Sequence, residues 1–271
     1  MTTSLKNKTA LVTGASSGLG REIAQLLAER GARVFGTARN PQSATPIPGV
    51  EMIAMDVTDD ASVIGAVQSI VQKAGPIQLL VNNAGYALTG SVEETSLTEA
   101  RQQFETNFFG VLRVTSAVLP EMRMAGFGRI ANISSVVGFL PSPFMPMYAA
   151  SKHAVEGYTE SLDHEVRSFG VRALLIEPSY TKSNIAHSGQ EAEARLSAYA
   201  TQRELSSQTV KKGIENGDDA LLVAEAVFTA LTAHSPRVRY PVGKGIALSR
   251  LRRWLPADLF GRAIRKELKL Q

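Results

Sequence analysis

The sequence contains no cysteine, and this absence excludes several kinds of protein. Without thiols there is no disulfide framework, no thiolate metal site and no cysteine nucleophile. Long apolar runs are missing too, since no uncharged stretch approaches the ~18 residues of a membrane-spanning helix, and the apolar stretch after residues 1–8 is too short for a secretory signal. We therefore expect a cytoplasmic protein. No metal site is expected, because the four histidines lack carboxylate partners at ligand spacing: His153, His164, His187 and His234.

Acidic residues are scarce at the C-terminal end of the chain. Residues 237–271 contain ten Lys and Arg but only two Asp and Glu, against 29 and 25 in the whole chain. Residues 1–236 therefore hold 19 basic and 23 acidic side chains and are mildly acidic. A nucleic-acid partner is not expected, because residues 246–271 offer only Trp254 and Phe260 as aromatic side chains for base stacking.

The basic end is also amphipathic. From Leu251 to Leu268 the apolar residues fall on one side of a helix and most Lys and Arg on the other, which predicts a basic helical extension over 246–271. It could lie on an anionic membrane surface, cover a cleft of the core, or pack on the core with its charged side in solvent. We favour the last of these.

Short β-rich runs alternate with longer helix-periodic segments along the chain. This alternation predicts a parallel sheet covered on both faces, in a single-domain α/β fold of the Rossmann-like, doubly wound type over residues 1–245. Residues 181–216 are polar and weakly periodic, and we expect them to be a mobile helical insertion. The predicted strands are 9–12, 33–37, 51–55, 78–81, 129–133, 171–176 and 237–240, and the helices are 18–30, 62–74, 98–125, 148–169 and 218–233.

A glycine-rich loop separates the first predicted strand from the first helix. Glycines permit the close backbone approach that a dinucleotide pyrophosphate needs, and a helix start offers free N–H groups. The spacing is G-x-x-x-G-x-G, and any tight strand-to-helix turn also uses glycine, so its place after the first strand carries the prediction. The predicted contacts are Gly14, Ser16, Ser17, Gly18, Leu19 and Gly20.

The end of the second strand predicts which cofactor binds. An Asp or Glu there would accept from a ribose 2′-hydroxyl and repel a 2′-phosphate, but this chain has no carboxylate between Thr37 and Asn40. Arg39 offers a planar cationic group that suits a phosphate. We therefore expect NADP(H), the alternative being that Arg39 is an ordinary surface side chain.

Tyr148 and Lys152 lie four residues apart at the start of a helical segment, so their side chains share one face. A nearby ammonium would lower the pKa of the Tyr148 phenol, as a proton donor to a ketone requires. Ser134 and Ser135 follow a predicted strand at the edge of the sheet where ligands bind, although two serines could equally cap a turn.

Together these motifs resemble the short-chain dehydrogenase/reductase family from about Thr9 to Tyr240, and within it the hydroxysteroid and retinol dehydrogenase-like branch. The resemblance is carried in order by Thr13-Gly14-x-x-x-Gly18-x-Gly20, Asp56-Val57, Asn82-Asn83-Ala84-Gly85, Asn107, Ser135 and Tyr148-x-x-x-Lys152. One departure is Ser179, which stands after Pro178 where the family commonly has glycine.

The resemblance implies a role for each matching residue. Tyr148 would be the general acid or base, and Ser135, thirteen residues earlier, would bind the substrate carbonyl, so both are the expected substrate contacts. Lys152 would tune Tyr148 and hold the nicotinamide ribose, and Asn107 would support a water unless it marks only a helix irregularity. Further cofactor contacts would come from Asp56, Val57, Asn83, Ala84, Gly85, Pro178 and Thr181, besides Tyr148 and Lys152.

These predictions amount to an NADP(H)-dependent oxidoreductase that interconverts a ketone or aldehyde and its alcohol. Residues 136–147 are rich in aromatic and Met side chains, which would either wall an apolar substrate pocket or pack on the neighbouring helix. The alternative function is an NADP(H)-binding sensor or scaffold without turnover. The resemblance also implies a homodimer or homotetramer formed through the helices over 98–125 and 148–169.

Overall fold

The computed structural model describes residues 4–182, 189–268 and 270. His187 and small parts of the predicted insertion (181–216) and of the extension (246–271) lie outside these residues. None of the helices in the described ranges is both long and apolar enough to cross a lipid bilayer.

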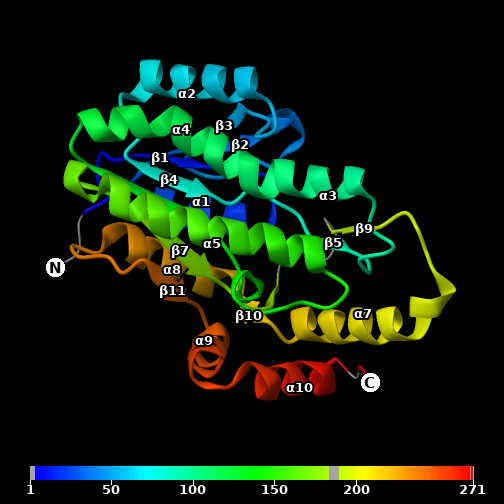
Figure 1. Cartoon of the computed structure of the whole chain (residues 1–271). Coiled ribbons are helices and arrows are strands. Elements are labelled where there is room, and N and C mark those ends of the chain that lie inside the picture. The colour runs from blue at the N-terminus through cyan, green and yellow to red at the C-terminus, as the bar shows by residue number, and fades with distance from the viewer. Residues whose placement is uncertain (1–3, 183–188, 269, 271) are drawn as a thin grey trace.

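Seven parallel strands form one sheet, in the order β11-β7-β6-β4-β1-β2-β3 (Figure 1). The first strand lies near the middle, flanked by β2 and β4, so the chain winds outward in both directions from it. This confirms the predicted doubly wound α/β fold. The strands are β1 (Thr9–Val12), β2 (Arg33–Ala38), β3 (Val50–Ala54), β4 (Leu79–Asn82), β6 (Gly128–Ile133), β7 (Val171–Glu177) and β11 (Arg239–Pro241).

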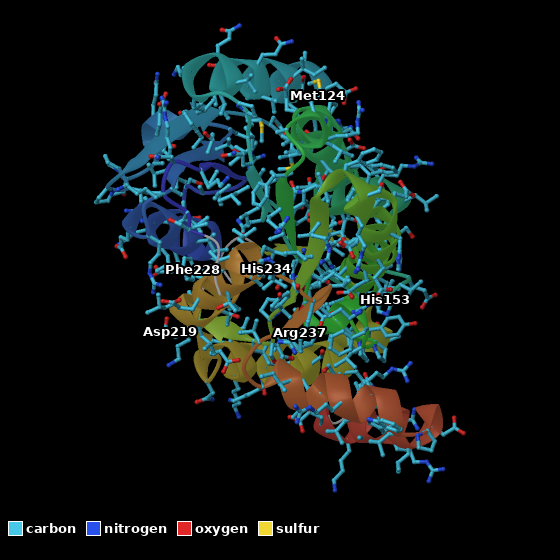
Figure 2. The ribbon with its side chains drawn as sticks, turned by 90° about the vertical axis from the view of Figure 1, so that its left-hand side faces the viewer. Met124, His153, Asp219, Phe228, His234 and Arg237 are labelled. Carbon is cyan, nitrogen blue, oxygen red and sulfur yellow. The ribbon has the colours of Figure 1, made fainter. Side chains whose placement is uncertain are left out.

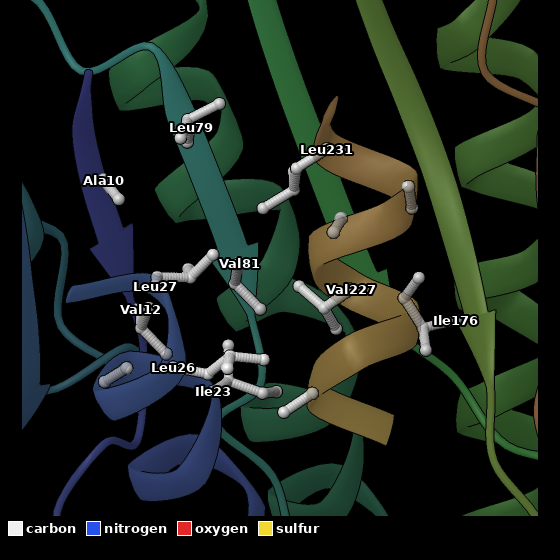
Figure 3. Packing of buried hydrophobic residues seen from close by; sticks show 14 of the residues in the cluster. Ala10, Val12, Ile23, Leu26, Leu27, Leu79, Val81, Ile176, Val227 and Leu231 are labelled. Carbon is white, nitrogen blue, oxygen red and sulfur yellow. The ribbon is translucent and has the colours of Figure 1, made fainter. Parts of the chain in front are cut away.

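Helices cover both faces of the sheet because its strands are apolar on both sides. Ala10 and Val12 of β1 pack under α1 and α8, together with Ile23 and Val227 (Figure 3). Leu11, between them, points to the opposite face and joins the cluster formed with α2, α4 and α5. The helices are α1 (Gly18–Glu29), α2 (Asp60–Ala74), α4 (Gly110–Met124), α5 (Pro146–Val166) and α8 (Ala220–Thr232).

The helix predicted over 98–125 is three segments in the structure. The helix α3 (Leu97–Phe104) runs into a π-helical turn (Glu105–Phe109), and α4 follows. Such turns occur as single-turn bulges inside α-helices, so a helical sequence pattern does not reveal them. The turn contains Asn107, so the irregularity falls on a predicted site residue.

The region after β7 combines short strands with a helix. The strand β8 (Thr181–Lys182) pairs with β10 (Asp218–Asp219), and β5 (Leu88–Thr89) pairs with β9 (Gln190–Glu191). The helix α7 (Ala200–Glu215) lies between β9 and β10 in the chain. The last predicted helix starts two residues late, at Ala220, because Asp218 and Asp219 are used in β10.

The C-terminal extension forms two helices, α9 (Gly245–Trp254) and α10 (Ala257–Glu267), with Pro256 at the break between them. Their apolar sides pack on the segment that follows β6: Phe260 is buried against Val136 and Leu140. In Figure 1 the two helices lie at the end of the molecule away from α2, with α10 below α7.

Candidate active site

A cavity of about 1650 Å³ opens at the carboxyl ends of the strands. Its volume exceeds the roughly 300–1,000 Å³ typical of a site for one ligand, so it has room for a dinucleotide and a second molecule. Apart from Asn107, every predicted site residue lines it. One end is formed by the glycine loop, Arg39 and Asp56; the other by residues 136–145, α7, α9 and α10.

The glycine loop is closed by contacts that leave no space for side chains. A Cβ atom at Gly20 would lie 2.3 Å from both the Gly14 carbonyl oxygen and the Asn83 amide nitrogen. Gly14 and Gly18 have φ angles of +66° and +54°, in the region that favours glycine. The backbone at the start of α1 therefore borders the cavity directly, which is the cradle that a pyrophosphate requires.

Asn83 and Thr13 hold this loop. The Thr13 hydroxyl oxygen accepts from the backbone N–H groups of Asn83 and Ala84, both at 2.9 Å. The Asn83 amide donates to the carbonyl oxygens of Thr13 (3.0 Å) and Gly14 (3.2 Å). The sequence predicts that Asn83 lines the cofactor; the structure adds that its amide fixes the loop, and that Thr13, not predicted as a site residue, is its partner.

Arg39 and Asp56 lie at the same end of the cavity. Arg39 is exposed, and within the described part of the chain its guanidinium makes no ion pair. The Asp56 carboxylate accepts from the backbone N–H (2.9 Å) and hydroxyl (2.8 Å) of Thr58. These bonds, with the charge of Arg39, lower the pKa of Asp56, so it stays ionised and binds its own turn as well as bordering the cavity.

Tyr148 and Lys152 come from the first turns of α5, which Pro146 begins. The Lys152 Nζ atom lies 5.9 Å from the centre of the Tyr148 ring and donates to the Ile133 carbonyl oxygen at 2.7 Å. Ser135 follows the end of β6 and lines the cavity together with Tyr148 and Lys152. The end of β6 and the start of α5 thus bring their polar groups to one part of the cavity wall.

The electrostatics of this pair differ from the expectation. Burial raises the pKa of Tyr148, and the Ser135 hydroxyl only partly offsets the effect. Burial likewise lowers the pKa of Lys152 to about 8, opposed by the negative charge of Glu156. The lowered Tyr148 pKa predicted from the sequence is wrong for the protein by itself, because desolvation favours the neutral form of both groups.

Asn107 is buried and does not line the cavity. Its amide oxygen accepts from the Tyr86 backbone N–H at 3.0 Å, and its amide nitrogen donates to the Tyr86 carbonyl oxygen at 2.9 Å. The side chain thus fixes the backbone beside Gly85 from behind. The π-helical turn directs this side chain to Tyr86, and the support of a water by Asn107 stays a prediction.

The loop after β7 completes the wall near Ser135. The Pro178 carbonyl oxygen accepts from the Val136 backbone N–H at 2.9 Å, and the Ser135 hydroxyl lies 3.4 Å from the same oxygen. The Thr181 hydroxyl donates to the Ser179 carbonyl oxygen at 3.1 Å. Ser179 stands where glycine was expected, and the hydrogen bond between the segments that follow β6 and β7 is still formed.

The second end of the cavity is largely apolar. The segment after β6 contributes Val136, Val137, Leu140 and Met145, whereas Phe139 and Phe144, also expected there, do not line it. The structure thus supports both readings of this segment, residue by residue. The extension, expected to pack on the core, also forms a wall of the cavity through Leu248, Leu251, Leu255, Phe260, Ala263, Ile264 and Leu268.

The helix α7 closes the same end and is tied to the core. Glu94 is buried, pairs with Arg203 of α7, and accepts from the backbone N–H of Leu196 at 2.9 Å. Tyr199 donates its hydroxyl to Glu93. These polar contacts tie α7 and the segment before it to the core, and the mobility expected of residues 181–216 stays a prediction.

Within the described residues, no three His, Cys, Asp or Glu side chains gather as a group that could hold a metal ion. His153 and His234 lie well apart in Figure 2. His153 instead contacts the Ala149 carbonyl oxygen of its own helix at 2.9 Å.

Comparison with known proteins agrees with this fold. The family model described as short chain dehydrogenase matches residues 8–194. A 3-ketodihydrosphingosine reductase of Bacteroides thetaiotaomicron is 36% identical, over 94% of this chain and 96% of the relative. A crystal structure of a short-chain dehydrogenase from Streptomyces avermitilis superimposes with a TM-score of 0.80 at 32% identity, covering 95% of this chain and 98% of the other.

The predicted branch is supported as well. Dehydrogenase/reductase SDR family member 7B of Bos taurus is 32% identical over 84% of this chain and 71% of the relative. With the matching family model, the doubly wound sheet and the glycine loop, these similarities confirm the resemblance seen in the sequence: the chain belongs to the short-chain dehydrogenase/reductase family of oxidoreductases.

Proposed function

We propose that this protein is an NADP(H)-dependent oxidoreductase that interconverts a ketone or aldehyde and the corresponding alcohol, with an apolar substrate. The observation that carries the proposal is the meeting of Ser135, Tyr148 and Lys152 in the wall of a cavity whose other end is the glycine loop. A sensor or scaffold without turnover would need neither a proton donor nor a second polar group at that point.

The residues of the cavity fit a dinucleotide. The lack of space for a Cβ at Gly20, and the first turn of α1 that borders the cavity, suit a pyrophosphate. Arg39 would bind the 2′-phosphate, Asp56 and Val57 would border the adenine, and Lys152 would hold the nicotinamide ribose. The remaining contacts would be Gly14, Ser16, Ser17, Gly18, Leu19, Asn83, Ala84, Gly85, Tyr148, Pro178 and Thr181.

When bound, the reduced nicotinamide supplies a hydride to a carbonyl carbon. The protein's own part is to hold the carbonyl oxygen between the hydroxyls of Ser135 and Tyr148. Tyr148, kept protonated by burial, donates its phenolic proton to that oxygen in reduction and accepts it back in oxidation. Lys152 lies beside the phenol and stabilises the phenolate that remains.

An apolar substrate is supported by the side chains beyond Tyr148. Residues from the segment after β6, from α9 and from α10 form a continuous aliphatic surface there, with Leu140, Leu251 and Ile264 among them. The related Bacteroides protein is named for reduction of a long-chain ketone, which agrees with a wall of this kind.

The test is oxidation of NADPH with a panel of carbonyl compounds: small aldehydes, long-chain ketones, steroids and retinoids. We expect turnover with an apolar member of the panel and a higher kcat/KM with NADPH than with NADH. Equal or better efficiency with NADH would contradict the cofactor assignment, and tight NADPH binding without turnover of any compound would favour the sensor.

The quaternary structure is proposed from the family resemblance, as a homodimer or homotetramer formed through the helices α4 and α5. Light scattering of the purified protein tests it: a mass equal to the single chain at micromolar concentration would contradict it.

A further inference from the structure

Two buried carboxylates and a partly exposed arginine form a cluster next to Lys152 in the structure, outside the cavity. We refer to Glu156, Glu177 and Arg239 as the carboxylate cluster. Glu156 is 4% exposed and follows Lys152 by one turn of α5, and Glu177 is 1% exposed and ends β7 just before Pro178. Arg239, from β11, contacts both carboxylates. The cluster therefore touches the helix and the strand that carry two parts of the proposed site.

Glu156 also reaches the third part. One of its carboxylate oxygens accepts from the hydroxyl of Ser134, the neighbour of Ser135, and the other accepts from Arg239. A Cβ atom at Gly138 would lie 2.6 Å from the Ser134 hydroxyl oxygen and 2.7 Å from Glu156, so glycine is needed to make room for this bond. The position of Glu156 is thus fixed from both sides.

The charges around Glu156 do not balance without Lys152. On α5, buried Glu156 lies one turn after buried Lys152, and its negative charge acts on the ammonium without a direct ion pair, since the two charged groups are more than 4 Å apart. Tyr148 lies one turn before Lys152 and Glu160 one turn after Glu156; Glu177 faces Glu156 from β7 and Arg239 faces it from β11. Arg239, 38% exposed, is shared among three carboxylates. Burial and the charge of Glu156 raise the pKa of Glu177 and hold it toward its neutral form, which leaves Lys152 as the buried cation that faces Glu156.

We propose that Glu156 is a positioning residue for the reaction: its carboxylate is the counter-charge that keeps the Lys152 ammonium beside Tyr148, and it anchors the Ser134–Ser135 segment through Ser134. This inference rests on the proposed function, in which Lys152 acts on Tyr148. The family motif ends at Lys152 and assigns no part to the residue four positions later.

The test compares Glu156→Gln with Glu160→Gln. Glutamine keeps the size of Glu156 and its ability to accept from Ser134 but removes the charge. Glu160 binds the same guanidinium at 2.8 Å and is 48% exposed, so the control removes an equal charge from the solvent side of the cluster. The measurement is the pH dependence of kcat and kcat/KM for ketone reduction by NADPH, with the Tm of each variant.

In the wild type, the alkaline limb is expected near the pKa of Lys152, about 8. Without the negative charge of Glu156 the pKa of Lys152 falls, so the limb of Glu156→Gln moves to lower pH by roughly one unit or more. Below that limb kcat/KM approaches the wild-type value, and Glu160→Gln follows the wild-type curve throughout. Coincident curves for Glu156→Gln and wild type, or equal shifts in both variants, would overturn the proposal.

If Glu156→Gln does not fold, Ser134→Ala decides. It keeps the charge and removes only the anchoring bond, so kcat should fall several-fold while the alkaline limb stays at its wild-type pH; an unchanged kcat would refute the anchoring. Failure of the proposed function looks different, because the wild type itself would then reduce no carbonyl compound.

Discussion

The two ends of the cavity are built in different ways. The end formed by the glycine loop, Arg39 and Asp56 is called the nucleotide end here, after the ligand proposed for it. There the central strands β1, β2 and β4 fix the backbone, and atoms around Gly14 and Gly20 approach so closely that no side chain fits. The opposite, largely apolar end is called the substrate end. Its helices α7, α9 and α10 are attached to the rest of the protein by a few side chains, such as Arg203 of α7 and Phe260 of α10. Ser135, Tyr148 and Lys152 lie where the two ends meet.

This difference suggests a division of labour. In the proposed function, the rigid end would bind the dinucleotide through backbone groups, which nearly any substitution would disturb. The substrate end presents exchangeable side chains on helices at the surface, so that changes there alter specificity at small cost to the fold. The comparison predicts that substitutions at the two ends affect different quantities.

The largest effect is expected where the two ends of the cavity meet, at Tyr148. Tyr148→Phe removes the proton donor but keeps the ring, so kcat should fall by about a hundred- to ten-thousandfold. NADPH binding and Tm should stay close to wild type, since the change deletes one hydroxyl. Retention of most reductase activity would contradict the mechanism, because it would show that Tyr148 is not the proton donor.

At the nucleotide end, Gly20→Ala should abolish dinucleotide binding, because the new methyl would lie 2.3 Å from the Gly14 carbonyl oxygen. Isothermal titration with NADPH measures this. The matched control is Gly65→Ala in α2, where no atom lies within 4 Å of the added Cβ; it should bind normally and gain up to about 1 kcal/mol in stability. Normal NADPH binding by Gly20→Ala would show that the glycine loop can shift to accommodate the methyl group, and would contradict its rigidity.

The cofactor preference should depend on Arg39. A charge-assisted hydrogen bond contributes about 1.5–3 kcal/mol, so Arg39→Ala should lower kcat/KM with NADPH by about ten- to a hundredfold. Efficiency with NADH should change little, since NADH lacks the 2′-phosphate. Equal losses with both cofactors would mean that Arg39 supports the fold of this end rather than its choice of ligand.

At the substrate end, a smaller and more selective effect is expected. Phe260→Ala removes a buried ring that lines the cavity, so KM for apolar ketones should rise by roughly tenfold, the order expected for part of a phenyl group's burial. NADPH affinity should not change. Leu259→Ala, at a neighbouring position that is 51% exposed, is the control and should behave as wild type. A loss of NADPH binding in Phe260→Ala would contradict the claim that the two ends of the cavity bind different ligands.

The sequence predicted the rigid end well, for a physical reason. Strand alternation and the glycines at Gly14, Gly18 and Gly20 are local signals, and the strands set by them bring Asp56 and Asn83 to one edge. The expected strands therefore agree with the structure within about two residues at each end. The cavity lined by the predicted cofactor residues follows from this agreement.

The sequence was less informative where contacts join distant segments. Helical periodicity could not show the π-helical turn at Asn107, nor that Asn107 faces Tyr86. The two-helix extension was seen as amphipathic, but which surface its apolar side covers depends on Pro256 and on the segment after β6. The sequence does carry one indication that Glu156 lies near Lys152. It follows Lys152 by four residues, the same spacing that places Lys152 near Tyr148.

The central claim is that one cavity holds NADP(H) at its rigid end and a carbonyl compound at its apolar end, with Tyr148 between them. The most direct test incubates the wild-type protein with NADPH that carries deuterium at the transferable position and with an apolar ketone, and then analyses the alcohol by mass spectrometry. The account predicts one deuterium on the carbinol carbon, and none in the Tyr148→Phe reaction over the same time. Tight binding of the labelled cofactor with no deuterium in any product across the carbonyl panel would contradict it.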